Sequence, residues 1–360
     1  MTIPKVHLLH ETNPRKYFPA IYLLEQEGQI SLSGEYRYSV IKEWFRAWLR
    51  DRTSIRVRTE NAWKDLRFRL SCFSLKDEII IMGFAPWDWR ILLYRHLARR
   101  NRIIYHTSWH DWGLNKVPRR SYPRLIRRFL QNQWKCFLKL PNVKTVAVTQ
   151  SVAKGLQAEM GVSATVIPHA VPSEFFNAQH RERKTKNLKL LFVGEISKKK
   201  GVLVLLDVMK DLSKRGVELT IVGNGPLASK VVNADHAINY LGQINARVDL
   251  AKVMSEHDVL VLLSQRTKTW EELFGIVIVE AMATGMAIMA SDHIGPREIL
   301  LPARSSGLFY EDDISGIKQL LTTMAQDRKE LSKLRQSQAG IAETYSIGSI
   351  SSKWLEVIKT

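Results

Sequence analysis

The sequence predicts an α/β protein of two domains. Short apolar runs, typical of buried parallel strands, alternate with longer amphipathic stretches of helical periodicity. The chain has 360 residues, which is too long for one ordinary hydrophobic core and suits about two domains. The expected strands are 6–10, 78–82, 102–106, 145–149 and 165–168 in the first half and 189–193, 218–222, 239–241, 259–263 and 287–290 in the second, with helices such as 200–215 and 248–256 between them.

Two prolines and a polar run indicate where the domains meet. Pro168 and Pro172 stiffen the chain as it leaves the last strand of the first series. The segment 180–188 is polar enough to be a surface linker. We therefore expect an N-terminal domain over residues 1–172 and a C-terminal domain over residues 173–344.

The net charge of +19 is large and uneven. Residues 1–180 contain 29 Lys and Arg against 14 Asp and Glu, a net charge of +15, so the second half is nearly neutral. Such asymmetry favours a polyanionic partner surface, either nucleic acid or an anionic membrane.

Cysteine usage and hydropathy indicate the compartment. The two cysteines, Cys72 and Cys136, have no metal-ligand spacing, which fits a reducing compartment and buried free thiols. The N-terminal residues run directly into a strand pattern, unlike a signal peptide, and no apolar run approaches the roughly 18 residues of a membrane span. We expect a soluble, intracellular protein.

The segment Lys189–Gly201 reads as a strand, a glycine turn at Gly194 and a helix that begins near Lys200 and Gly201. Free amides and the dipole at a helix start favour a phosphate group. The alternative is a surface cluster of solvated lysines. A second strand ends in Gly-Asn-Gly-Pro at 223–226, which is a weak signal alone because such turns also open dinucleotide-binding folds.

The most informative segment is 270–285. It contains two carboxylates, Glu272 and Glu280, with Phe274 and Gly275 just after the first. Residues 276–279 are β-branched and would pass locally as a strand, whereas 280–284 looks helical. The alternative is a capped helix with two unrelated surface glutamates.

Taken in order, these motifs resemble those of the family-4 glycosyltransferases, which are retaining enzymes with the two-domain GT-B fold. The resemblance covers roughly half of the chain and includes Val-Gly followed by Lys-Gly, the Val-Gly-x-Gly-Pro turn, Leu241-Gly242, the segment 270–285 and, in part, residues 291–298. It implies two Rossmann-like domains facing across a cleft, with the last helix, 345–360, crossing back to the first domain.

The resemblance also implies an activity, the transfer of a sugar from a nucleoside diphosphate sugar to an acceptor hydroxyl. Lys200 would hold the diphosphate, Glu272 would contact the donor sugar near its reacting carbon, and Glu280 would accept hydrogen bonds from the ribose hydroxyls. The helix would start near Gly275. The implied donor-binding residues are Gly194, Lys200, Gly201, Phe274, Gly275, Ile276 and Glu280.

Two departures from the family pattern concern phosphate binding. Glu195 stands where the family has a diphosphate-binding Arg, so Lys198 or Lys199 would have to compensate, or donor affinity would be weaker. The loop 10–16 lacks the glycines of the family's first loop, although Arg15 and Lys16 could still meet a phosphate.

Family members place a histidine after the strand that corresponds to 102–106. His106 is the better match for this catalytic position and His110 is the second candidate; the alternative is a packed structural histidine. We expect no metal, because His106, His110 and Asp111 have no second ligand cluster nearby. The family needs no cofactor besides its donor substrate.

The stretch 119–139 predicts a basic amphipathic helix. With Trp87, Trp89 and Arg90 nearby in sequence, it would suit an anionic membrane surface. The alternative is an ordinary domain helix with a buried apolar stripe and solvated arginines, and both hold if only the basic face touches lipid. Its candidate acceptor or membrane residues are Arg119, Arg120, Arg124, Arg127 and Arg128.

We therefore expect a glycosyltransferase of surface polysaccharide or glycolipid assembly, located in the cytoplasm and peripheral on the inner face of the membrane, with a lipid-linked or glycan acceptor. One rival is a nucleotide-sugar epimerase or hydrolase of the same fold, which would turn over donor without acceptor. The other is a basic nucleic-acid-binding protein, but the sequence lacks the aromatic-lined basic motifs that such proteins use, so we expect no nucleic acid partner.

Overall fold

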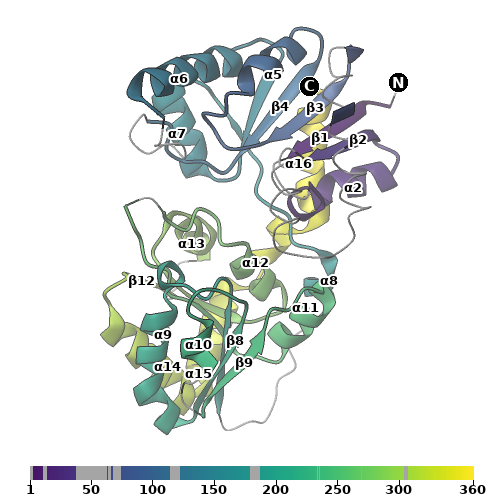
Figure 1. Cartoon of the computed structure of the whole chain (residues 1–360). Coiled ribbons are helices and arrows are strands. Elements are labelled where there is room, and N and C mark those ends of the chain that lie inside the picture. Colours follow the sequence, from purple (N-terminus) through teal and green to yellow (C-terminus); the bar gives the residue numbers. More distant parts are fainter. Residues whose placement is uncertain are drawn as a thin grey trace. The chain divides into compact units, whose positions relative to one another are not determined.

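The computed structural model describes residues 3–10, 14–37, 63, 66–67, 74–113, 122–178, 187–232, 234, 236–268, 270–303 and 307–360. The chain divides into two compact units, each a parallel six-stranded sheet between helices (Figure 1). Unit 1 comprises residues 1–170 and 347–360, and unit 2 comprises residues 171–346. The α/β class expected from the alternating pattern is confirmed.

Unit 1 begins with a strand and is completed by the last helix of the chain. Its elements are β1 (Lys5–His10), α1 (Pro14–Tyr17), α2 (Pro19–Gln26), β2 (Ser31–Arg37), β3 (Ile79–Gly83), α5 (Ile91–Leu97), β4 (Arg102–Thr107), α6 (Arg124–Leu138), β5 (Val143–Ala147), α7 (Gln150–Met160), β6 (Thr165–Val166) and α16 (Ile347–Lys359).

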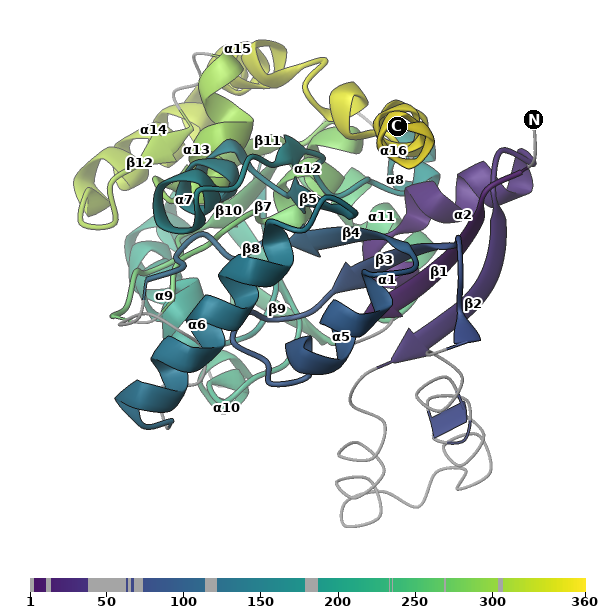
Figure 2. The same cartoon turned by 90° about the horizontal axis from the view of Figure 1, so that it is seen from above.

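The sheet of unit 1 has the order β2-β1-β3-β4-β5-β6, and it is covered on both faces (Figures 1 and 2). Strand β3 shows why its sequence is a continuous apolar run. Ile79 and Ile81 pack on one face with α2 and α16, while Ile80 and Met82 pack on the other with α5, α6 and α7. Such two-sided burial is characteristic of parallel sheets.

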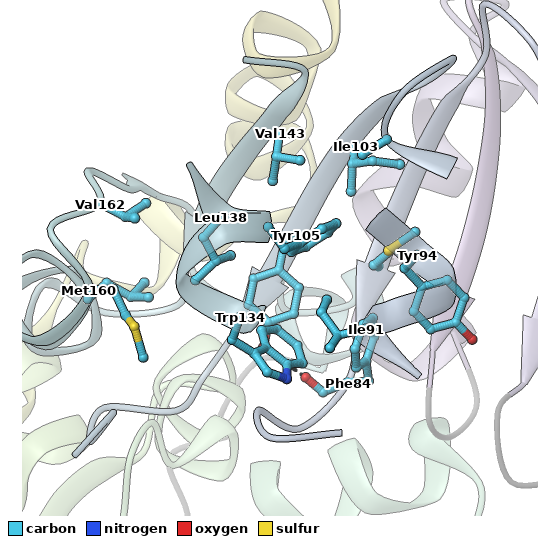
Figure 3. Packing of buried hydrophobic residues seen from close by; sticks show 14 of the residues in the cluster. Phe84, Ile91, Tyr94, Ile103, Tyr105, Trp134, Leu138, Val143, Met160 and Val162 are labelled. Carbon is cyan, nitrogen blue, oxygen red and sulfur yellow. Dashed lines mark hydrogen bonds between the residues drawn. The ribbon is translucent and has the colours of Figure 1, made fainter. Parts of the chain in front are cut away.

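The face covered by α5, α6 and α7 has an aromatic core. Tyr105 of β4 and Trp134 of α6 point toward each other, with ring centroids 5.2 Å apart, and Phe84 lies beside both (Figure 3). The Tyr105 hydroxyl donates to the Phe84 carbonyl at 2.9 Å, so the one polar atom of that ring is satisfied. This core fixes the position of α6 on the sheet.

Unit 2 has the strand order β12-β11-β10-β7-β8-β9. Its elements are α8 (Ser173–Asn177), β7 (Leu188–Val193), η2 (Lys198–Lys200), α9 (Val202–Leu212), η3 (Ser213–Arg215), β8 (Val217–Val222), α10 (Ala228–Val232), β9 (Ile238–Gly242), α11 (Arg247–Ser255), β10 (Val259–Leu262), α12 (Ile276–Ala283), β11 (Ala287–Ser291), α13 (Ile294–Leu300), η4 (Leu301–Ala303), β12 (Leu308–Phe309), α14 (Ile314–Gln326), α15 (Arg328–Gln338) and η5 (Ala342–Tyr345).

Two strands were not expected from the sequence. Strand β2 is an edge strand with the sequence Ser-Leu-Ser-Gly-Glu-Tyr-Arg, and β12 is an edge strand of two residues. An edge strand is not buried on both faces, so it lacks the apolar run that identifies the inner strands.

Three expectations about burial were wrong. Trp87 is only 1% exposed and belongs to the core. Arg90 donates to the buried Asp88 carboxylate at 2.7 Å, so neither side chain is available to contact a membrane. Cys136 is an exposed free thiol rather than a buried one, because it lies on the outer side of α6. Cys72 lies outside the described residues.

Candidate functional site

The topology of unit 2 directs attention to the carboxyl ends of two neighbouring strands. From β7 the chain moves outward to β8 and β9 and then returns to the other side of β7, where β10 pairs with it. In open parallel sheets, ligands bind beside the carboxyl ends of the strands where the order reverses. The segments 194–201 and 263–275, which follow β7 and β10, therefore form the candidate site.

The segment after β7 turns back sharply against the end of β10. Gly201 has φ +73°, and a Cβ atom there would lie 1.7 Å from the Leu263 carbonyl oxygen, so only glycine fits. The Gln265 N–H donates to the Lys199 carbonyl at 2.7 Å. Helix α9 then begins at Val202, close to the start near Lys200 and Gly201 that the sequence predicts.

An ion pair joins the two segments. The Lys200 ammonium donates to the Glu272 carboxylate, and it also lies 5.0 Å from the centroid of the Trp270 ring. Both partners are partly shielded, with 20% of the Lys200 side chain and 11% of the Glu272 side chain exposed. Two residues 72 positions apart in the chain thus meet at the reversal point of the sheet.

Glu195, which departs from the family pattern, is neutralised locally. The Lys199 ammonium lies 2.7 Å from the Glu195 carboxylate, and the Ser197 hydroxyl donates to the same carboxylate at 3.3 Å. The bond from Lys199 holds the pKa of Glu195 below its usual value. Lys199 is therefore occupied by Glu195, and the lysine that reaches Glu272 is Lys200.

Residues 276–283 form helix α12, so the helix start near Gly275 that the family resemblance implies is confirmed, although 276–279 looks locally like a strand. Gly275 precedes helix α12 with φ +74°, a left-handed conformation that favours glycine. The first amides of a helix have no partner inside it, so those at the start of α12 face outward along its axis. Phe274 is 7% exposed and anchors this turn, while Glu280 is half-buried one turn into the helix.

A histidine that we had not singled out supports Glu272. The Glu272 N–H donates to Nδ1 of His293 at 3.1 Å, and Nε2 of His293 lies 3.1 Å from Glu311. Burial lowers the pKa of His293, although Glu311 opposes this. A neutral ring that accepts at Nδ1 carries its proton on Nε2, which faces Glu311. His293 follows β11 at the same edge of the sheet, and that position is the signal that could have identified it.

A close backbone approach also holds the Glu272 segment. The Gly295 N–H donates to the Glu272 carbonyl at 3.0 Å, and a Cβ atom on Gly295 would lie 2.5 Å from the Phe274 backbone. At the other end of the site, Gly194 closes β7 and donates to Val222 at 3.0 Å. The Glu272 carboxylate is therefore positioned by backbone contacts rather than by its own loop alone.

In unit 1, His106 lies within β4 rather than after it, and it is buried. Its ring centroid is 5.0 Å from Phe18, 5.5 Å from His169 and 5.8 Å from Trp354. Burial, together with the nearby His169 and His10, holds the pKa of His106 well below 6.5. A neutral imidazole in aromatic surroundings suits a hydrogen bond to a sugar hydroxyl better than a charge interaction.

Of the two residues predicted to meet a phosphate, Arg15 and Lys16, Arg15 already has side-chain partners. Arg15 is paired with Glu35 at 3.1 Å, and its guanidinium lies 4.8 Å from the Tyr22 ring centroid. The backbone of Lys16 belongs to α1. His110 lies beyond the end of β4. Its backbone packs closely against Gly155, because a Cβ atom added to Gly155 would lie 2.1 Å from the His110 carbonyl oxygen.

Helix α6 is basic and amphipathic, as the sequence predicts, but it begins at Arg124; Arg119 and Arg120 lie outside the described residues. Arg124 and Arg128 are exposed, and Arg127 is half-buried. The apolar stripe is divided. Leu130, Trp134, Phe137 and Leu138 are buried, whereas Leu125, Ile126 and Phe129 are 80%, 46% and 51% exposed. The alternative of an ordinary domain helix with a fully buried apolar stripe therefore holds only from Leu130 onward.

Within the described ranges, no group of three or more His, Cys, Asp or Glu side chains could hold a metal ion. Among the helices that the structure describes, none is both long and apolar enough to cross a bilayer.

Comparisons with known proteins agree with the geometry. Residues 173–339 match the protein-family model described as glycosyl transferases group 1. The amylovoran biosynthesis glycosyltransferase AmsK of Erwinia amylovora is 25% identical over 222 residues, 59% of this chain and 52% of AmsK. The phosphatidyl-myo-inositol mannosyltransferase of Mycolicibacterium smegmatis is 30% identical over 194 residues, 51% of this chain and 48% of that protein. The chain thus spans about half the length of these relatives.

The whole fold also has solved counterparts. HepE of Anabaena in complex with UDP and glucose superimposes with a TM-score of 0.66 and 15% identity, over 100% of both chains. A glycosyltransferase from Rickettsia africae gives a TM-score of 0.69 with 13% identity, over 100% of this chain and 98% of that one. Likeness at such low identity concerns the fold, which is the GT-B fold that the motifs predict.

Proposed function

We propose that the protein transfers a sugar from a nucleoside diphosphate sugar to an acceptor hydroxyl, with retention at the anomeric carbon, because residues 173–339 match the family model described as glycosyl transferases group 1 and the fold is GT-B. The observation that carries this proposal is the meeting of Lys200 and Glu272 at the carboxyl ends of β7 and β10. A cation beside outward-facing helix amides suits a diphosphate, and a largely buried carboxylate suits sugar hydroxyls.

In the proposed reaction, Lys200 and Glu272 have different roles. When a donor binds, its diphosphate offers Lys200 more negative charge than Glu272 does, so the ammonium moves toward the phosphates. The Glu272 carboxylate is then released to accept hydrogen bonds from the sugar and to face positive charge that develops at the anomeric carbon. Lys200 and the first amides of α12 stabilise the diphosphate as it leaves.

The rest of the donor fits the same edge. Glu280, one turn into α12, accepts from the two ribose hydroxyls of the nucleoside. Gly194 and Gly201 leave room for the diphosphate next to the backbone. The complexes of HepE with UDP support a nucleoside diphosphate as the leaving group. In unit 1, the buried neutral His106 is the candidate that the family resemblance offers for a single hydrogen bond to a sugar hydroxyl.

We place the acceptor on a membrane. The names of the relatives mention amylovoran biosynthesis and phosphatidyl-myo-inositol, a polysaccharide and a lipid headgroup, which supports a lipid-linked or glycan acceptor. Leu125, Ile126 and Phe129 enter the lipid interface from the first turns of α6, while Arg124 and Arg128 meet anionic headgroups. Trp89 and Leu92, at the start of helix α5, are also exposed, by 59% and 46%, and are further apolar side chains of unit 1 that could meet lipid.

Thermal unfolding with nucleotides tests the enzyme proposal. A rise in the melting temperature with UDP, GDP or ADP is expected, and the nucleotide that gives the largest rise identifies the base of the donor. No rise with any of the three would contradict the proposal. Proton NMR of the matching nucleotide sugar then separates the rival activities, because an epimerase or hydrolase consumes donor without an acceptor whereas a transferase does so only slowly.

A further inference from the structure

A basic hollow lies at the edge of the unit 1 sheet that is opposite to the edge with His106. It encloses about 710 Å³ and is lined by residues just before or at the starts of three adjacent parallel strands, β3, β4 and β5. The carboxyl edge, with His10 and His106, is at the other end of these strands. The lining residues are Lys76, Asp77, Arg99, Arg100, Asn101, Arg102 and Asn142.

The floor of this hollow is rigid because Asn101 connects three segments. Its side-chain amide donates to the carbonyls of Leu75 and Leu97 at 2.9 and 3.1 Å, and its carbonyl oxygen accepts from the Glu78 N–H at 3.1 Å. Asn101 is only 3% exposed, so these bonds are shielded from water. The backbone before β3 is thereby fixed against the backbone before β4.

The backbone at Asp77 adds to this fixed geometry. Asp77 has φ +59°, which is uncommon for a residue with a side chain, and its N–H donates to the Arg100 carbonyl at 2.9 Å. This bond places the segment that contains Lys76 directly beside the segment that contains Arg99 and Arg100.

The charge of the hollow is not balanced. Four cations and one carboxylate line it, and within the described part of the chain neither Arg99 nor Arg100 forms an ion pair. Arg102 donates only to the Val357 carbonyl, at 3.3 Å. Glu78, the nearest further carboxylate in sequence, is paired with His7 instead. Asp77, the carboxylate among the lining residues, lies 3.8 Å from the Lys76 ammonium. The three guanidinium groups therefore have no carboxylate partner among the described residues, an arrangement that attracts anions.

We propose that this hollow, defined by Lys76, Arg99, Arg100 and Arg102, is a binding site for a multiply charged phosphate group, separate from the donor site. Guanidinium groups bind phosphate oxygens through paired N–H bonds, and adjacent arginines can hold two phosphates at once. The hydrogen bonds of Asn101 fix the backbone segments that carry these cations before the ligand arrives. The chemistry fits either a soluble phosphorylated compound or a phosphate-bearing lipid headgroup.

The test uses the full-length protein with Lys200→Ala, so that pyrophosphate cannot use the donor site. Isothermal titration calorimetry with pyrophosphate is expected to show binding, and adding Arg99→Ala and Arg100→Ala should weaken it by at least about tenfold. The charge-matched control adds Lys154→Ala and Lys353→Ala, two exposed lysines of unit 1 away from the hollow, and should leave the affinity within about twofold.

Two further arms distinguish the source of the phosphate and the role of geometry. If the variant with Arg99→Ala and Arg100→Ala loses binding both to pyrophosphate and to vesicles that contain phosphatidic acid, the ligand is a lipid headgroup. If it loses binding to pyrophosphate alone, the ligand is a soluble compound. Arg99→Lys with Arg100→Lys keeps the charge and should recover only part of the affinity. The proposal is overturned if the Lys200→Ala protein does not bind pyrophosphate, or if the control pair weakens binding as much as the arginine pair.

Discussion

The two units use the same sheet design but place different chemistry at the point where the strand order reverses. In unit 1 the reversal lies between β1 and β3, and the nearby side chains are aromatic or imidazole: His10 stacks on Tyr17 at 4.6 Å, and His106 and His169 lie close by. In unit 2 the reversal lies between β7 and β10 and carries the Lys200–Glu272 ion pair.

This difference shows that the sheet supplies a position and the loops supply the chemistry. In unit 2 the loops carry glycine and charged residues, which suit the strongly anionic ligand that we propose. In unit 1 the side chains are neutral rings, which suit the proposed contacts with the apolar faces and single hydroxyls of a sugar. Each prediction below alters one side of this contrast.

The largest effect is expected from Lys200→Met. The change removes the cation of the proposed donor site and leaves the Glu272 side chain, 11% exposed, without its partner. We expect kcat/KM for the donor to fall about a thousandfold and stabilisation by the nucleoside diphosphate to disappear. Steady-state kinetics and thermal unfolding measure both. Lys198→Met, in the same turn but exposed, is the control, and equal losses in the two variants would refute a specific role for Lys200.

Substitutions of Glu272 and Glu280 should change different kinetic constants. Glu272→Gln should lower kcat about a hundredfold with little change in donor KM, because its charge matters mostly in the transition state. Glu280→Gln should raise donor KM about tenfold with little change in kcat, because ribose binding is the same in the ground and transition states. If both variants change both constants equally, the proposed division of roles is wrong.

A smaller effect is expected from the apolar end of α6. Leu125→Ser with Phe129→Ser should reduce binding to anionic liposomes by about tenfold or more, because each side chain loses up to about 2 kcal/mol of apolar burial. Activity on a soluble acceptor should not change. The control Val248→Ser with Tyr310→Ser removes two exposed apolar side chains from unit 2. Sedimentation of the protein with liposomes in high salt is a second measurement. Binding by inserted apolar side chains persists in high salt, whereas purely electrostatic binding does not.

The smallest effect concerns pH. The folded protein keeps His106 neutral with a pKa well below 6.5, whereas the unfolded chain takes up this proton as the pH falls below about 6.5. Stability is therefore fully present above that pH and is lost on acidification, by at most about 1.4 kcal/mol per pH unit for this group. His106→Phe should flatten part of the decline between pH 7 and pH 5 in urea unfolding, while His257 and His293, whose pKa values burial also lowers, retain the rest.

The matched control for this measurement is His96→Gln, since His96 is exposed. An unchanged pH dependence in His106→Phe would mean that His106 is not the buried neutral group that the structure describes.

Inner strands and the glycine turn at Gly201 were predictable because their signals are local. A strand buried on both faces must be apolar, and a turn such as Gly201 must be glycine, so both can be read from a few adjacent residues. The edge strands β2 and β12 could not be predicted in this way, because partial burial places weaker demands on their residues.

Contacts between distant segments were not predictable either. The support of Glu272 by His293, and the pairing of Lys199 rather than Lys200 with Glu195, depend on how loops meet at the edge of the sheet. The exposure of Leu125 has a related cause. Helical periodicity identifies the apolar face of α6, but it does not reveal that the buried part of that face starts only at Leu130.

Helix α16 has a consequence for the order in which the chain folds. Ile350, Trp354 and Ile358 belong to the same core as Phe18 and Ile21, so unit 1 is completed by residues that the ribosome makes after the whole of unit 2. Unit 2 can therefore reach its native state first, while the face of the first sheet beneath α16 stays uncovered. Closing the long intervening loop costs entropy, and this makes the docking of α16 a natural late step of folding and the interval before it the stage most vulnerable to aggregation.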